Sequence, residues 1–166
     1  GRREVNVIFS KEQGADLVEG ILTHTDRLCD PQPVFVTVPG AGDYWAWRPT
    51  VLRIFHQPGD ASLLSLPVIA RHAPALPGDV FLAREPWFHV RTEPNGNVVI
   101  RYGGGAERIV TPAGKFKVRW PGSWNTGRSM YRWMARSALH VTAVQLMRAD
   151  ADSPWVWHIE FTRTEP

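Results

Sequence analysis

The tetrapeptide Glu93-Pro94-Asn95-Gly96 constrains the fold of this chain more than any other stretch. Pro at its second position presets φ, and Gly at its fourth position takes a positive φ without strain, as a type I turn closed by a glycine bulge requires. The turn sets the register of the hairpin around it, because a slip of one residue would exchange the two faces. The predicted pairs are Thr92 with Val98, Arg91 with Val99, Val90 with Ile100, His89 with Arg101 and Phe88 with Tyr102. One face is then apolar and the other mostly cationic.

A second turn of the same kind follows at Thr111-Pro112-Ala113-Gly114. Residues 115–120 after it alternate charged and apolar side chains, and this alternation is typical of a half-buried antiparallel strand. Its apolar members are expected to join the apolar face of the first hairpin in one core made of Phe116, Val118, Trp120, Phe88, Val90 and Ile100. Residues 87–120 are therefore predicted to form a β-meander, with Gly103-Gly104-Gly105 in its middle connection.

Length and composition predict one folded domain. The 166 residues are enough to bury roughly two thirds of the unfolded surface. Apolar residues make up 43% of the chain and charged residues 21%, which is ordinary for a folded soluble domain. No apolar run approaches the roughly 20 residues of a membrane span, so no membrane partner is predicted. We expect a single β-rich domain over residues 1–166, and a start at Gly1 instead of Met fits a piece excised from a larger protein.

Basic residues are concentrated in the second half of the chain. Residues 101–136 contain eight Lys or Arg residues against one acid, Glu107, although the net charge of the whole chain is only +3. Most of the basic residues are Arg, whose planar guanidinium suits phosphate, carboxylate and aromatic faces. The second half of the chain is therefore expected to carry the basic surface of the protein.

Outside the meander, alternating side chains and turn residues predict further strands at residues 4–9, 34–38, 50–56, 63–70, 80–85, 141–147 and 155–162. A short helix is expected to begin at Ser10, because Ser10 and Gln13 have the spacing of a capping box. Residues 130–139 fit either a helix or a bent strand, and both alternatives stay open.

These elements indicate an all-β fold. About nine or ten strands, at most about two short helices and frequent turn signals favour an antiparallel β-sandwich, jelly roll or barrel. The βαβ alternation of nucleotide-binding folds is absent from the pattern.

Neither catalytic nor metal-binding motifs stand out. The chain has no G-x-S-x-G, P-loop or H-E-x-x-H motif, and its six histidines show no H-x-H spacing, so no metal or cofactor is predicted. The single cysteine, Cys29, excludes internal disulfides and is expected to be a buried or inert thiol. Asp43 and Asp79 lie at predicted turns, where carboxylates usually serve the turn, although convergence into a hydrolase site stays an alternative.

Eight tryptophans suggest a first candidate site. Trp120, Trp155 and Trp157 occupy predicted core positions, and Trp87 is expected opposite Gly103 on the cationic face. The aromatic residues that lie beside loops form the candidate ligand-binding patch, which consists of Tyr44, Trp45, Trp47 and Trp124. Exposed rings of this kind offer a flat platform to a sugar, a base or a partner's side chain. In the alternative interpretation, the indoles cap the end of the core.

The second candidate site is the cationic sheet face, a predicted anion-binding surface that consists of His89, Arg91, Arg101, Lys117 and Arg119. Such a face could hold a nucleic-acid backbone, a sulfated glycan or an acidic protein. The alternative is a solvated outer face, because exposed strands commonly carry Lys and Arg that prevent pairing with other chains.

The leading functional hypothesis is a non-enzymatic binding or structural module. It would present a rigid β surface to a protein or glycan partner, within an assembly such as a coat or fibre or as a homo-oligomer. The first alternative is a nucleic-acid-binding β-barrel that uses the basic sheet face. The second is a hydrolase. The sequence assigns no compartment.

Overall fold

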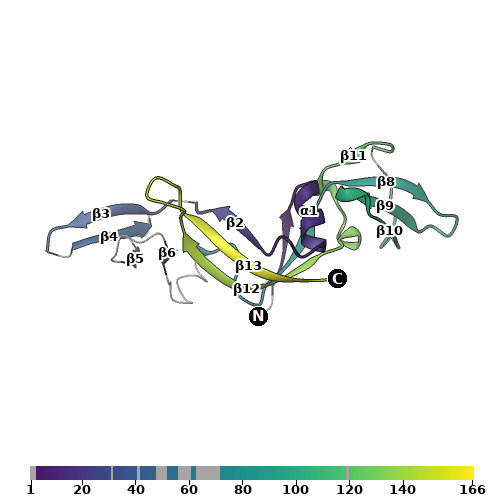
Figure 1. Cartoon of the computed structure of the whole chain (residues 1–166). Coiled ribbons are helices and arrows are strands. Elements are labelled where there is room, and N and C mark those ends of the chain that lie inside the picture. The colour runs from purple at the N-terminus through teal and green to yellow at the C-terminus, as the bar shows by residue number, and fades with distance from the viewer. Residues whose placement is uncertain are drawn as a thin grey trace. The chain divides into compact units, whose positions relative to one another are not determined.

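The computed structural model of the chain describes residues 3–30, 32–40, 42–47, 52–55, 61–62, 72–118 and 120–166. For residues 35–38, 42–47, 52–55 and 61–62 the description covers the backbone alone. The described strands are β1 (Glu4–Ile8), β2 (His24–Leu28), β3 (Val34–Val38), β4 (Gly42–Trp47), β5 (Leu52–Phe55), β6 (Ala61–Ser62), β7 (Val80–Arg84), β8 (Trp87–Thr92), β9 (Val98–Tyr102), β10 (Glu107–Val110), β11 (Trp124–Asn125), β12 (Ala138–Met147) and β13 (Val156–Thr164). The structure contains the α-helix α1 (Lys11–Val18) (Figure 1). Short 3₁₀ turns occur at Gly103–Gly105, Gly127–Ser129 and Arg132–Met134. The predicted all-β class is confirmed.

The chain divides into two compact units. The first, called unit 1 below, comprises Gly1–Thr23, Gly78–His140 and Thr162–Pro166, and unit 2 comprises His24–Pro77 and Val141–Phe161. Strands β12 and β13 contribute residues to both units. Within the described parts of the chain, no helix is both long enough and apolar enough to cross a membrane.

The described strands form three sheets. The largest has the strand order β1-β7-β12-β13-β2, with β6 paired to β12. Its β1–β7 pair is parallel, whereas the other pairs with described registers are antiparallel. A parallel pair requires a long connection, and the segment from residue 9 to residue 79 separates these two strands in sequence.

The second sheet lies in unit 1 and has the order β10-β9-β8-β11. The predicted turn closes its β8–β9 hairpin: Gly96 has φ +89°, and its N–H donates to the carbonyl of Glu93 over 2.9 Å. The two pairs nearest the turn, Thr92 with Val98 and Arg91 with Val99, have the predicted register. The predicted turn and the register of the two pairs next to it are therefore confirmed.

Beyond those two pairs, the predicted register is wrong. A β-bulge between His89 and Arg91 shifts the pairing, because one extra residue, Val90, is accommodated on β8. The resulting pairs are His89 with Ile100, Phe88 with Arg101 and Trp87 with Tyr102, in place of Val90 with Ile100, His89 with Arg101 and Phe88 with Tyr102. The shift turns the large Trp87 indole into the core, where it is 2% exposed, and leaves Phe88 and Val90 half-buried.

The strand predicted at residues 115–120 is absent from the described residues of that segment, and β10, before the second turn, completes the meander instead. Gly114 has the expected positive φ of +95°. Phe116 has no cross-strand neighbour and packs edge-on against the rings of Tyr131 and Trp133. Trp120, predicted in the core, is 60% exposed. Phe116 does pack against the core cluster that contains Trp87 and Ile100, whereas Trp120 stays in solvent, so the alternating side chains do not share one buried face.

Residues 130–139 adopt neither predicted structure throughout. A 3₁₀ turn at Arg132–Met134 precedes β12, which begins at Ala138 and is longer than the predicted strand. Met134 is fully buried, and its carbonyl accepts a hydrogen bond from the hydroxyl of Tyr102.

Helix α1 begins as predicted. The hydroxyl of Ser10 accepts from the backbone N–H of Gln13 over 3.1 Å, and the Gln13 side chain accepts from the Ser10 N–H over 2.9 Å. Both halves of the capping box are present. The helix buries Leu17 and Gly14.

A buried ion pair links several segments of unit 1. Glu85 is 0% exposed and Arg136 is 4% exposed, and the guanidinium donates to the carboxylate over 2.7 Å. Arg136 also donates to the carbonyl of Gly103, and Arg163 of β13 donates to the carbonyl of Arg136. The helix touches the pair at Gly14, where a Cβ would lie 2.2 Å from Glu85 Oε1.

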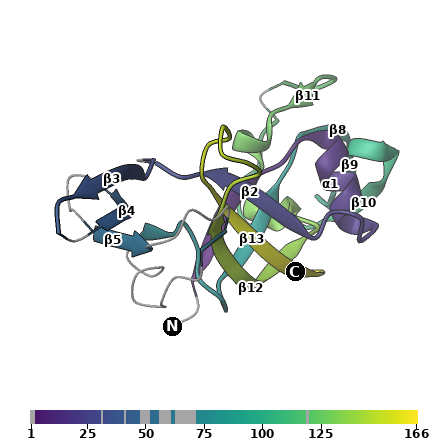
Figure 2. The same ribbon diagram turned by 60° about the vertical axis from the view of Figure 1, so that its left-hand side comes forward.

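In unit 2, β3, β4 and β5 form an antiparallel sheet, and β2 pairs with β13 (Figure 2). Trp155 and Trp157 are buried, as predicted. Cys29 follows β2 and is 2% exposed, which confirms the expected burial of its thiol. The strand predicted at residues 63–70 lies outside the described residues.

The contact between Gly14 and Glu85 generates a prediction. Gly14→Ala would normally favour a helix by roughly 1 kcal/mol, but here we expect destabilisation by about 1–3 kcal/mol, because the added methyl group overlaps the buried carboxylate. Urea unfolding followed by circular dichroism measures the difference. Glu12→Ala, at an exposed position of the same helix, serves as the control and should change stability by less than about 1 kcal/mol. A more stable Gly14→Ala variant would contradict the packing described here.

Candidate functional site

Unit 1 contains a cleft beside the first residues of β8. Its volume is about 540 Å³. The described residues that line it are Trp87, Lys117, Trp120, Trp124, Asn125, Thr126, Arg128, Ser129 and Tyr131. Most of them belong to the segment between the second turn and the 3₁₀ turn at Arg132–Met134. We call this feature the aromatic cleft.

Three rings of the aromatic cleft are open to solvent. Trp120 is 60% exposed, Tyr131 43% and Trp124 40%. Exposed aromatic faces are costly in water unless a ligand covers them, and they make flat platforms for other rings.

Neighbouring side chains fix the position of two of these rings. The Trp124 ring lies 5.8 Å from the Phe88 ring, and the ammonium of Lys11 lies 4.2 Å from its centre. Tyr131 stacks on Trp133 with ring centres 5.4 Å apart. Binding of a ligand would therefore cost little side-chain entropy at these two rings.

Two paired strands contribute to the lining of the cleft. Strand β11 pairs with β8, which places Trp124 opposite Phe88 and Asn125 opposite Trp87. Trp87 and Asn125 are buried, and the indole N–H of Trp87 has no hydrogen-bond partner among the described residues. An unsatisfied buried donor of this kind is unusual and costs about 1–3 kcal/mol.

The charge of the cleft is positive. Lys117 and Arg128 are exposed and line it, and the described lining residues include no carboxylate. The lining hydroxyls belong to Thr126, Ser129 and Tyr131, and no histidine lies among the described lining residues to act as their base. The arrangement suits binding of a ligand that combines a flat ring with negative charge.

The residues of the predicted aromatic patch belong to two different units. Trp124 lines the aromatic cleft of unit 1. Tyr44, Trp45 and Trp47 have their backbone in β4 of unit 2, and their side chains lie outside the described part of the structure. The patch as a set of four residues therefore stays a prediction.

Among the described residues of the predicted anion-binding face, two cations have carboxylate partners. The Arg91 guanidinium bonds the Glu93 carboxylate over 3.0 Å, and Arg101 bonds Glu107 over 2.9 Å, so acids offset both cations. His89 pairs with Ile100 instead of Arg101 because of the bulge.

The remaining members of that face have different surroundings. Burial lowers the pKa of His89, because desolvation disfavours the charged imidazolium. Lys117 lines the aromatic cleft, and Arg119 lies outside the described residues.

Of the two turn carboxylates, Asp79 is buried. It accepts from the backbone N–H of Arg3 over 3.3 Å and from the guanidinium of the same residue over 3.2 Å. These bonds connect Asp79, which precedes β7, to Arg3, which precedes β1. The side chain of Asp43 lies outside the described residues.

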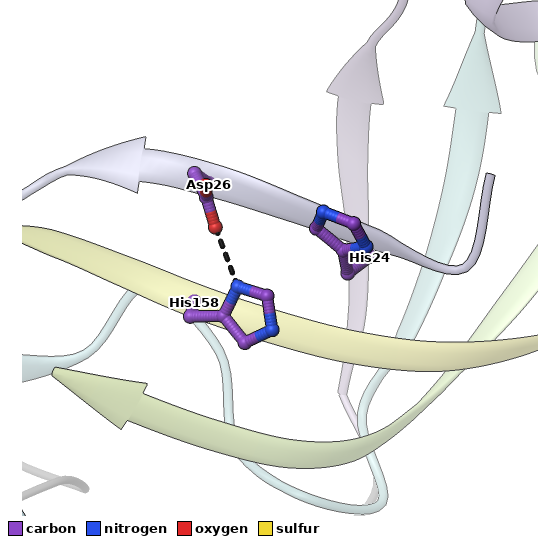
Figure 3. A group of neighbouring side chains, drawn as sticks. All are labelled: His24, Asp26 and His158. Carbon is purple, nitrogen blue, oxygen red and sulfur yellow. Dashed lines mark hydrogen bonds and ion pairs between the residues drawn. The ribbon is translucent and has the colours of Figure 1, made fainter. Parts of the chain in front are cut away.

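A second cluster of polar side chains lies in unit 2. His24 and Asp26 belong to β2, and His158 belongs to the neighbouring β13, with the carboxylate of Asp26 directed at the His158 ring (Figure 3). The distance from His158 Nδ1 to Asp26 Oδ1 is 2.7 Å, and the two imidazole rings have centres 4.8 Å apart. Within the described chain, these three residues have the side-chain atoms and the spacing to hold a metal ion.

This cluster was not predicted, because its histidines do not have H-x-H spacing in the sequence. His24-x-Asp26 and His158-x-Glu160 each place two metal-binding side chains on one face of a strand. That spacing in two segments was the available signal, and the pairing of β2 with β13 was not predictable from either segment alone.

No protein-family model matches this chain, and comparisons with curated proteins and with solved structures found no match.

The contrast between Trp87 and Trp120 generates a prediction about the cleft. Trp87→Ala should reduce the free energy of unfolding by about 3–5 kcal/mol, because it removes a buried indole from the core. Trp120→Ala should change it by less than about 1 kcal/mol, because that ring is mostly in solvent. Chemical denaturation of both variants provides the measurement. Equal losses of unfolding free energy in the two variants would contradict the solvent exposure of the Trp120 ring.

Proposed function

We propose that unit 1 is a non-enzymatic binding module whose aromatic cleft takes single-stranded nucleic acid. The observation that carries this proposal is the combination, in one cleft, of three exposed rings with two cations and no carboxylate among the described lining residues. Bases would stack on the rings, and phosphates would lie beside Lys117 and Arg128.

The energies of the two interactions support this assignment. Stacking of a base on an aromatic side chain contributes roughly 1–3 kcal/mol, and it tolerates any base sequence. Each phosphate that a cation neutralises releases condensed counterions, so the affinity falls as salt increases. A single strand, unlike a duplex, has bases free to reach the rings.

A neutral glycan is the second candidate ligand. The observation that favours it is the presence of polar side chains, those of Thr126 and Ser129, beside Trp120 and Trp124 in the cleft lining. Sugar rings stack on indoles, and their hydroxyls take hydrogen bonds from such groups. Binding of this kind would depend little on salt.

Fluorescence anisotropy with a labelled single-stranded oligonucleotide, measured over a range of salt concentrations, tests the proposal. Lys117→Ala and Arg128→Ala should each reduce the slope of log affinity against log salt by about 0.7. Trp120→Ala should weaken binding by about 1–3 kcal/mol without a change of slope, because it removes stacking and no charge.

Arg91→Ala is the matched control. It also removes one exposed guanidinium from unit 1, but from a residue that is already paired with Glu93, so it should leave the affinity within about twofold. Loss of affinity in Arg91→Ala equal to that in Arg128→Ala would indicate a general polyanion surface instead of the cleft. Salt-independent binding of a neutral glycan that Trp120→Ala abolishes would establish the second candidate.

A further inference from the structure

Four side chains able to bind metal ions share one face of the β2–β13 pair in unit 2. His24 and Asp26 are two residues apart on β2, so both point to the same side of the strand. The antiparallel register places Glu160 opposite His24 and His158 opposite Asp26. The four residues therefore occupy the corners of a cross-strand quadrilateral.

This face is accessible from solvent. The side chain of Asp26 is 49% exposed, that of Glu160 is 56% exposed and that of His158 is 21% exposed. The residues on either side of His158 in β13, Trp157 and Ile159, point to the opposite face and are buried. An ion could therefore reach the cluster without any opening of the core.

The donor atoms of the cluster lie near one another, as the ligand atoms around a bound ion do. One donor atom from each of His24, Asp26 and His158 lies within 4.8 Å of the other two. Around a tetrahedral ion with bonds of 2.0–2.2 Å, ligand atoms are separated by about 3.4 Å. Rotation of side chains, with no change in strand pairing, would bring the three donors to that separation. The carboxylate of Glu160 lies 3.6 Å from His158 Nε2, the ring nitrogen that does not face Asp26, so it is not counted among the ligands.

The donor set selects the class of ion. Two imidazoles and one carboxylate suit Zn²⁺ and neighbouring transition ions, whereas Mg²⁺ and Ca²⁺ prefer oxygen ligands alone. The geometry points to a Zn²⁺-binding site formed by His24, Asp26 and His158. This inference is independent of the aromatic cleft, which lies in the other unit.

Binding at this position would join two strands. In the order of its sheet β2 is the last strand, and it belongs to unit 2 together with the part of β13 that carries His158. An exposed His–Asp pair by itself contributes little to stability. An ion held by both strands would oppose their separation, because it binds the paired state and not the separated strands.

Isothermal titration of the full chain, without a histidine tag and after treatment with a chelator, tests this inference with ZnCl₂ and MgCl₂ as the probes. We expect one Zn²⁺ per chain and no Mg²⁺ binding. His24→Gln, Asp26→Asn and His158→Gln should each weaken Zn²⁺ binding at least about tenfold. His140→Gln is the matched control, since His140 bonds Thr164 outside the cluster, and it should bind Zn²⁺ as the parent does.

Thermal melting gives a second readout for the same variants. Zn²⁺ at about 100 times its dissociation constant should raise the melting temperature of the parent by roughly 5–10 °C and leave that of His158→Gln unchanged. Circular dichroism confirms that each variant is folded. The inference is overturned if the parent binds no Zn²⁺, or if all three cluster variants bind it as tightly as His140→Gln does.

Discussion

The ion pair between Glu85 and Arg136 is the interaction on which unit 1 depends. Neither charge can be left unpaired, because loss of one partner from a buried pair costs about 3–5 kcal/mol. The pair joins three segments of unit 1. Glu85 directly follows β7, Arg136 lies two residues before β12, and the carbonyl of Gly103 accepts from the guanidinium. Arg163 brings β13 to the same point. Helix α1 packs against the carboxylate through a glycine because no larger residue fits.

The loop that lines the aromatic cleft packs against the segment that carries Glu85. Gly127, in the loop that carries Trp124 and Arg128, lies so close to the backbone of Arg84 and Glu85 that a Cβ would be 3.2 Å from it. The inner side of the loop is therefore closely packed, although its outer surface is open to solvent. Closely packed support beneath exposed rings is the arrangement that the proposed binding function requires.

Local rules predicted local structure well. The capping box of Ser10 and the glycine turn at Gly96 depend on residues three or four places apart, and both are present. Where the competing interactions come from distant residues, the predictions were wrong: the bulge at Val90 buries Trp87, and Phe116 packs on Tyr131 instead of joining a strand. The cleft and the His24 cluster depend on such distant contacts. Of the predicted site residues, Trp124 and Lys117 line the cleft.

Because Cys29 is buried, the reactivity of its thiol can be used to follow local opening of unit 2. The backbone N–H of Cys29 donates to the carbonyl of Trp155 over 3.0 Å, and the residue is buried. A reagent specific for thiols can reach a buried sulfur atom only when the structure around it opens. Since the chain has one cysteine, the rate of modification measures how often this part of unit 2 opens, without any signal from unit 1.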